Sequence, residues 1–80
     1  MTMKITDLFN TSDLSLVITI SLHFPIKYID RSNNNRIEFA FDNSLELQKL
    51  VEAFWQNELR IEPKQFYQQL RIIKARIYDK

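Results

Sequence analysis

The feature that most constrains this chain is that none of its 80 residues is glycine. An average sequence of this length would contain about five or six glycines. Without them the chain cannot form a GxGxxG dinucleotide turn, a glycine-rich phosphate loop or a glycine-flanked nucleophile elbow. The absence of cysteine excludes disulfides and thiolate zinc sites, and a single histidine, His23, excludes a pair of histidine metal ligands. We therefore expect a protein that is not an enzyme and needs neither a cofactor nor a metal.

Length and composition predict one small globular domain over residues 1–80. A chain of this size buries enough surface for a small core, and 45% apolar, 12% aromatic and 26% charged residues are typical of a compact protein. The most apolar segment, residues 14–26, is shorter than the ~20 residues of a membrane helix and is interrupted by polar side chains. No signal-peptide pattern is visible, so we expect a soluble, cytoplasmic protein.

Residues 26–41 have the pattern of a β-hairpin. Apolar residues alternate on both sides of a polar cluster at residues 31–36, and Ile37, Phe39 and Phe41 share one face of the second strand. The turn of such a hairpin needs positive φ, for which asparagine is the best residue after glycine. The asparagines at positions 33–35 are therefore expected to replace glycine in the turn.

Two helices are expected after the hairpin. Asn43 as N-cap and Glu46 three residues later predict a capping box. The apolar stripe that follows consists of Leu47, Leu50, Val51, Phe54 and Trp55. This helix should end near Asn57 or Glu58, and Pro63 suits the first turn of the next one. The apolar stripe of the last helix consists of Phe66, Leu70, Ile73 and Ile77.

The segment before the hairpin allows two interpretations. Apolar residues alternate with mostly polar ones from Leu14 to Phe24, and many are β-branched, which favours a strand. Thr11, Ser12 and Asp13 form a typical helix N-cap cluster, however, and the apolar residues also fit one face of a helix. The residues alone lean slightly to a strand.

A series of short motifs runs through nearly the whole chain. They are Phe9, Thr11-Ser12-Asp13-Leu14, Phe39-Ala40-Phe41, Phe54-Trp55, Ile61-Glu62-Pro63, Phe66 and residues 70–78, Leu-Arg-Ile-Ile-Lys-Ala-Arg-Ile-Tyr. Through these motifs the chain resembles a small family of domains of unknown function from bacteria, archaea and their mobile elements. The resemblance implies a helix from Asp13 to about Leu22, which we adopt. The family usually has glycine after this helix, where the present chain has His23, Phe24 and Pro25.

We therefore expect an α+β fold with the order α-β-β-α-α, in which a hairpin packs against three helices. The expected core consists of Leu14, Val17, Ile18, Leu22, Ile37, Phe39, Phe41, Leu47, Leu50, Val51, Phe54, Phe66, Leu70, Ile73 and Ile77. The family has no assigned activity, so the resemblance implies no catalytic residues.

The charges are divided unevenly along the chain. Residues 1–58 contain five basic and eight acidic side chains, a net charge of −3, whereas residues 59–80 contain six basic and two acidic ones, a net charge of +4. A basic segment of this kind suits an anionic partner. Cations also suit the C-terminal end of any helix, so a solvated helix face with a purely structural role is the favoured explanation of the basic segment taken alone.

One side of the expected last helix combines cations with tyrosines. The candidate nucleic-acid-binding residues are Lys64, Tyr67, Arg71, Lys74 and Tyr78. Arginine and lysine bind phosphates, and tyrosine stacks on bases. The polar surface is extended by Gln65, Gln68, Gln69, Arg76 and Lys80. We expect a binding module whose partner is nucleic acid or a nucleoprotein complex; the alternative for the two tyrosines is that they flank the core.

A protein partner is the alternative function. A domain of this size, resembling a family that occurs in mobile elements, fits a phage-encoded inhibitor of a host defence system (anti-CRISPR-like) that occludes a protein surface. Acidic side chains would then mimic phosphates, and the candidates are Asp7, Asp13, Asp30, Asp42 and Glu46. A metal-dependent nuclease built on Asp30, Glu38 and Asp42 is less favoured, because solvent-facing strand residues explain the same pattern.

Overall fold

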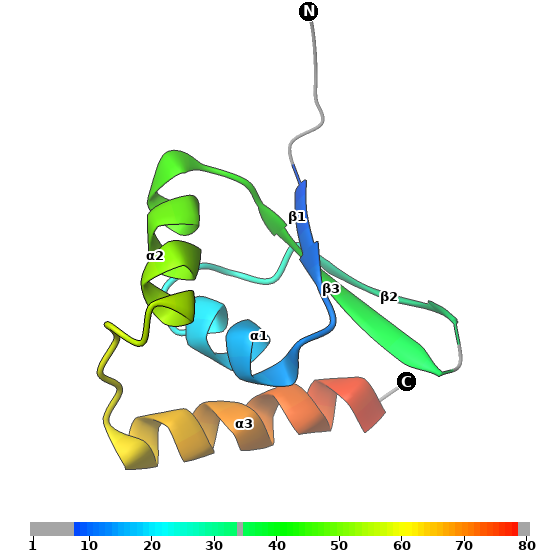
Figure 1. The fold of residues 1–80 in the computed structure, drawn as a ribbon. Coiled ribbons are helices and arrows are strands. Elements are labelled where there is room, and N and C mark those ends of the chain that lie inside the picture. Colours follow the sequence, from blue (N-terminus) through cyan, green and yellow to red (C-terminus); the bar gives the residue numbers. More distant parts are fainter. Residues whose placement is uncertain (1–7, 34, 79–80) are drawn as a thin grey trace, which may run out of the picture.

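In the part of the chain that the structure describes, a three-stranded antiparallel sheet and three helices make up the fold (Figure 1). The computed structural model describes residues 8–33 and 35–78. In chain order the elements are β1 (Leu8–Thr11), α1 (Leu14–Ser21), β2 (Tyr28–Asn33), β3 (Arg36–Asp42), α2 (Leu45–Trp55) and α3 (Pro63–Tyr78). The α+β class is confirmed, and the expected helix, hairpin and two C-terminal helices are all present. The strand β1 was not expected.

Strand β1 exists because it pairs with a distant part of the chain. The strand order is β1-β3-β2, so β3 lies in the middle of the sheet and β1 at one edge. Phe9 of β1 lies opposite Phe41 of β3, and Arg36 donates its Nε–H to Ser12 Oγ at 2.8 Å just beyond the strand. Four of the described residues belong to β1. Four residues give too little alternation to be recognised from sequence, because strands usually have about five or six residues.

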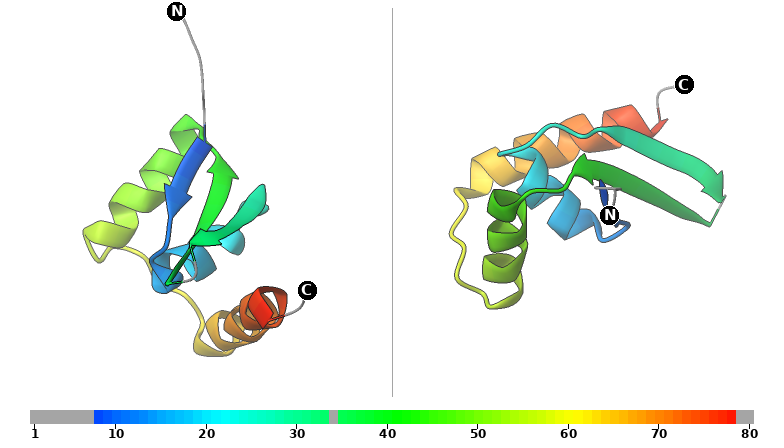
Figure 2. Two further views of the ribbon diagram at one scale, coloured as in Figure 1. Left: turned by 90° about the vertical axis from the view of Figure 1, so that its right-hand side faces the viewer. Right: turned by 90° about the horizontal axis from the view of Figure 1, so that it is seen from above.

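Helix α1 is the central helix of the domain. It contacts both α2 and α3, and Figures 1 and 2 show it between the sheet and α3. Five consecutive residues, 16–20, are buried. A helix that is covered around most of its circumference carries apolar residues on most of its surface, so the 3.6-residue period is obscured and the alternation resembles that of a strand. The lean to a strand was therefore wrong, and the helix implied by the family resemblance is confirmed.

Both ends of α1 are formed by local side-chain and backbone chemistry. The N-cap is Asp13, whose Oδ1 accepts the Leu16 N–H at 3.3 Å. At the other end, the N–H groups of His23 and Phe24 both bond to the Ile20 carbonyl, and no residue turns left-handed. Pro25 follows; it has no N–H to continue the helix and disfavours a helical conformation in the residue before it. Proline thus prevents the helix from continuing beyond Phe24.

The core lies between the sheet and the helices. Its fully buried apolar side chains are Leu16, Val17, Ile18, Ile20, Phe39, Phe41, Leu47 and Ile73. Leu16 and Ile20 were not among the expected core residues, and they are buried because α1 packs against both α2 and α3. Leu22, which was expected in the core, is half-buried. Thr19 is a buried polar residue, and its hydroxyl donates to the Ser15 carbonyl at 2.9 Å.

The N-cap of α2 lies one residue later than expected. Ser44 is the N-cap, and its Oγ accepts the Leu47 N–H at 3.1 Å. Asn43 instead accepts a hydrogen bond from Gln48 Nε2 at 3.1 Å. The capping box between Asn43 and Glu46 is therefore wrong. Serine and asparagine are about equally good N-caps, so adjacent candidates cannot be distinguished from sequence.

Helix α2 ends at a left-handed residue, Asn57, with φ of 61°. The Glu58 N–H bonds to the Ala53 carbonyl at 2.9 Å, and the Asn57 N–H bonds to the Phe54 carbonyl at 3.2 Å. These two bonds form a Schellman motif, in which glycine usually occupies the left-handed position. Asparagine replaces glycine here, at a position where the sequence analysis expected only the helix end. Asn34 of the hairpin turn lies outside the described residues, so positive φ in that turn stays a prediction.

Candidate functional site

All five predicted binding residues lie on α3, whose position is fixed along its length. Pro63 is its first residue, and the Glu62 carboxylate accepts the Gln65 N–H at 2.9 Å. Ile73 is 1% exposed and anchors the helix in the core. Three further side chains of α3 pack against the core: Phe66, Leu70 and Ile77. This apolar stripe is the one expected from the sequence.

Polar contacts from α1 and from β2 join α3 to the rest of the described domain. Gln69 Nε2 donates to Ser21 Oγ of α1 at 3.0 Å, and Arg31 of β2 donates through Nη2 to the Arg76 carbonyl. Gln69 is half-buried and serves this contact, so its assignment to the outer polar surface was wrong. The opposite face of α3 is thereby presented to solvent on a fixed helix, which favours precise placement of its side chains.

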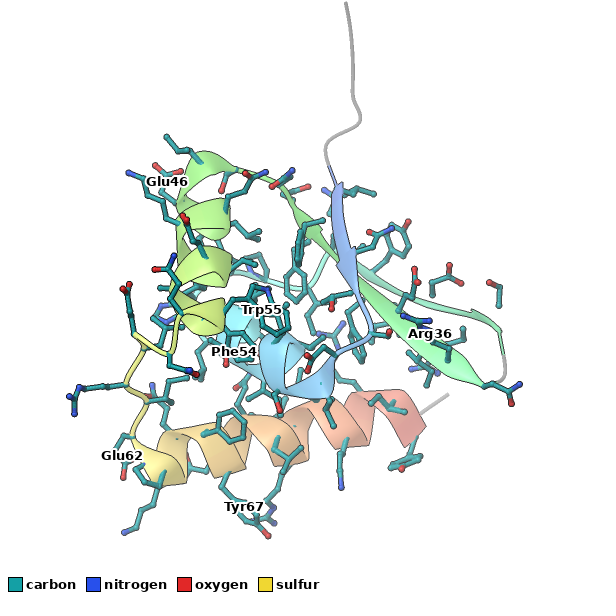
Figure 3. The ribbon with its side chains drawn as sticks, viewed as in Figure 1. Arg36, Glu46, Phe54, Trp55, Glu62 and Tyr67 are labelled. Atoms are coloured by element: carbon teal, nitrogen blue, oxygen red, sulfur yellow. The ribbon has the colours of Figure 1, made fainter. Side chains whose placement is uncertain are left out.

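The face of α3 that points away from the domain carries a basic–aromatic stripe, which we define as Lys64, Tyr67, Arg71, Lys74 and Tyr78. All five residues are exposed, with Tyr67 at 61% and Tyr78 at 76%. At about 100° and 1.5 Å per residue, they occupy an arc of about 80° and a length of about 21 Å. Figure 3 shows the Tyr67 side chain pointing away from the other elements. The two tyrosines are therefore exposed and not packed into the core.

The stripe has an uncompensated positive charge within the described residues. Pro63–Tyr78 contains four basic residues and no acidic one. The ion pair found in the described part of the chain joins Lys27 and Asp42 on the sheet, 3.7 Å apart, and the cations of the stripe form none there. An anion that approaches α3 thus meets free cationic side chains on a helix without carboxylates.

Two open hollows lie along the stripe, and Arg71 borders both. The first, of about 450 Å³, is lined by Pro63, Lys64, Tyr67, Gln68 and Arg71. The second, of about 470 Å³, is lined by Gln68, Arg71, Ile72 and Ala75. Ile72 is 53% exposed and was not considered in the sequence analysis. Its position outside the apolar stripe of α3 was the signal that could have identified it.

A groove of about 610 Å³ lies on another surface, between β1 and α2. Its lining residues are Phe9, Leu45, Gln48, Lys49, Val51, Glu52, Trp55 and Gln56. Trp55 was assigned to the apolar stripe of α2, but 60% of it is exposed, and its ring packs edge-on against Phe54 with centroids 5.0 Å apart. Lys49 and Glu52 balance each other in charge, so this groove has no electrostatic preference for an anion.

The outer face of the sheet is acidic. Asp30 of β2 lies opposite Glu38 of β3, and Asp42 lies near the end of the same face. Asp30 Oδ1 accepts the Ser32 N–H at 2.9 Å, and this bond lowers the pKa of the carboxyl below its ordinary value. No group of three metal-binding side chains occurs in the described residues. None of the helices there has the length and apolarity needed to span a bilayer.

The acidic residues of the inhibitor hypothesis lie on separate elements. Asp13 caps α1, Asp30 bonds to a backbone N–H in β2, and Asp42 pairs with Lys27. Glu46 lies in the first turn of α2. Asp7 lies outside the described residues. The structure thus engages three of these carboxylates in local interactions, and the inhibitor hypothesis stays a prediction.

These observations define a small α+β domain whose most distinctive surface is a basic helix with exposed tyrosines. Residues 6–79 match the model of the family described as Domain of unknown function (DUF5659), and the chain belongs to this family. The resemblance inferred from the short motifs is thereby confirmed. No curated protein and no solved structure matches the chain.

Proposed function

We propose that this protein is a non-enzymatic module that binds nucleic acid, free or within a nucleoprotein complex, through the basic–aromatic stripe of α3. The observation that carries the proposal is the division of α3 into two faces. One face is anchored by Ile73 in the core, and the other exposes three cations and two tyrosines with no carboxylate on the helix. Cations bind phosphates and position the chain, while aromatic side chains contact bases.

The arrangement favours binding at this face over other faces. Because α3 is fixed by the core and by polar contacts to α1 and β2, binding needs to order only exposed side chains. On the outer face of the sheet, Asp30 lies opposite Glu38 and Asp42 is paired with Lys27, so this face has no excess of cations and the stripe is the preferred approach for phosphate. The first of these features follows from the packing of α3, and the second follows from the positions of charges on the described elements.

The number of cations predicts a moderate, salt-sensitive affinity. If Lys64, Arg71 and Lys74 each neutralise one phosphate, the plot of log K against log salt has a slope of about −2 to −3. Most of the binding free energy then comes from counterion release, which does not depend on base sequence. We therefore expect little sequence preference.

Fluorescence anisotropy with labelled single- and double-stranded DNA and RNA, at low and moderate salt, tests the proposal. The test variant is the double substitution Arg71→Gln and Lys74→Gln, which should reduce the salt slope by about two. The matched control is the double substitution Lys27→Gln and Lys49→Gln. It removes the same number of positive charges, one from the segment before β2 and one from α2. Absence of salt-sensitive binding, or equal effects of the two double variants, would refute the proposal.

A further inference from the structure

The hollow at the start of α3 has the chemistry of a nucleotide site. Of its five lining residues, Tyr67 presents a flat aromatic ring, Pro63 an apolar aliphatic ring, Lys64 and Arg71 present cations, and Gln68 presents an amide. No carboxylate lines it. With about 450 Å³ it lies within the usual range of ligand sites, about 300–1,000 Å³. The hollow is open to solvent, so a ligand reaches it without any movement of the helix.

Each of these groups matches one part of a nucleotide. The Tyr67 ring and the planar Arg71 guanidinium both stack on bases. Lys64 supplies a point charge for a phosphate, and the Gln68 amide donates to and accepts from a base edge. Tyr67 is not needed in the core, because its neighbour Phe66 packs there. The exposed ring is thus available for a ligand.

Stacking on Tyr67 requires an accessible base face, and this requirement selects the form of nucleic acid. In a duplex the base faces are covered by neighbouring pairs, and only base edges and phosphates are presented in the grooves. We infer that the hollow binds an unpaired base and its phosphate, so that the stripe prefers single-stranded nucleic acid over duplex. This inference rests on the proposed function and specifies its ligand.

Tyr78 extends the same chemistry to the far end of the helix. It lies eleven residues after Tyr67, which places the two residues about 16 Å apart along α3. Arg71 and Lys74 lie between them on the same arc, where the phosphates of a strand joining two stacked bases would run. A single nucleotide reaches only one of the two tyrosines, whereas a strand reaches both.

The experiment compares three probes: a labelled single strand, a duplex of the same length and a mononucleotide. We expect the single strand to bind most tightly, and Tyr67→Leu to weaken its binding about 10- to 100-fold while changing duplex binding little. Tyr67→Phe, which keeps the aromatic ring, should preserve single-strand binding. Tyr28→Leu removes an exposed tyrosine from the sheet and should also leave binding unchanged.

The outcomes separate this inference from the proposed function. If duplex and single strand bind equally and Tyr67→Leu alters neither, the inference is overturned, whereas loss of binding in the Arg71→Gln, Lys74→Gln variant still supports the function. If the mononucleotide binds as tightly as the strand, the site is specific for free nucleotides and the preference for a strand is overturned. If no probe binds, the proposed function itself fails.

Discussion

Asn57 is the residue at which substitution by glycine should stabilise the protein. Its φ of 61° lies in the left-handed region, which costs a residue with a Cβ atom about 1–2 kcal/mol. Asparagine incurs less of this cost because its short polar side chain bonds locally, and glycine incurs none. Glycine loses about 0.4–1 kcal/mol through the greater freedom of the unfolded chain. We therefore expect the free energy of unfolding of the Asn57→Gly variant to be about 1 kcal/mol higher than that of the Asn57→Ala variant. The unsubstituted protein, with asparagine, should lie between the two.

Urea unfolding followed by circular dichroism measures this difference, which should also shift Tm by about 4–8 °C in a domain of this size. The neighbouring residue Gln56 provides the matched control, because it lies at the same helix end with φ of −91°. At that right-handed position glycine should be less stable than alanine. If Asn57→Ala is as stable as Asn57→Gly, or if glycine is preferred at both positions, the reasoning from the backbone angle is refuted.

Three further predictions concern packing, capping and pH. Ile73→Ala should lower the free energy of unfolding by about 2–5 kcal/mol in urea titrations, because it leaves a cavity, whereas Ile72→Ala on the exposed side should change it by about 0.5 kcal/mol or less. Ser44→Ala should cost about 1 kcal/mol and Asn43→Ala less; the reverse order would contradict the N-cap seen here. The pKa of the Asp30 carboxyl should lie below that of an unperturbed aspartate in NMR titrations. Its contribution to stability, complete above the unperturbed pKa, should be lost as the pH falls through the lowered pKa; an unshifted or raised pKa would contradict the hydrogen bond from the Ser32 N–H.

The sequence predicted α3 and its two faces because the signals for this helix are local. Pro63 indicates where the helix begins, and residues three and four apart form the apolar stripe that ends at Ile77. The basic–aromatic stripe occupies another arc of the same helix, so its members lie together as soon as the helix forms. The hollow beside Tyr67 could not be predicted from the sequence, because its depth depends on side-chain conformations.

The sequence was least informative for α1 and β1, where distant residues decide the structure. The alternation from Leu14 to Phe24 favoured a strand, but α1 lies between the sheet and α3 and is covered around most of its circumference. Strand β1 forms because it pairs with β3, where Phe9 lies opposite Phe41. Contacts between residues so far apart in the chain have no counterpart in a local pattern.

By itself, the glycine-free sequence determined which sites the chain cannot form, and its periodicity and charges placed a basic helix at the C-terminal end. Only the tertiary structure decided that residues 8–11 form a strand beside β3, that Trp55 is exposed and that the left-handed position falls at Asn57. The physical reason is the range of the interactions involved. Helical periodicity and charge act over a few residues, whereas burial and the way a helix ends depend on what packs against it.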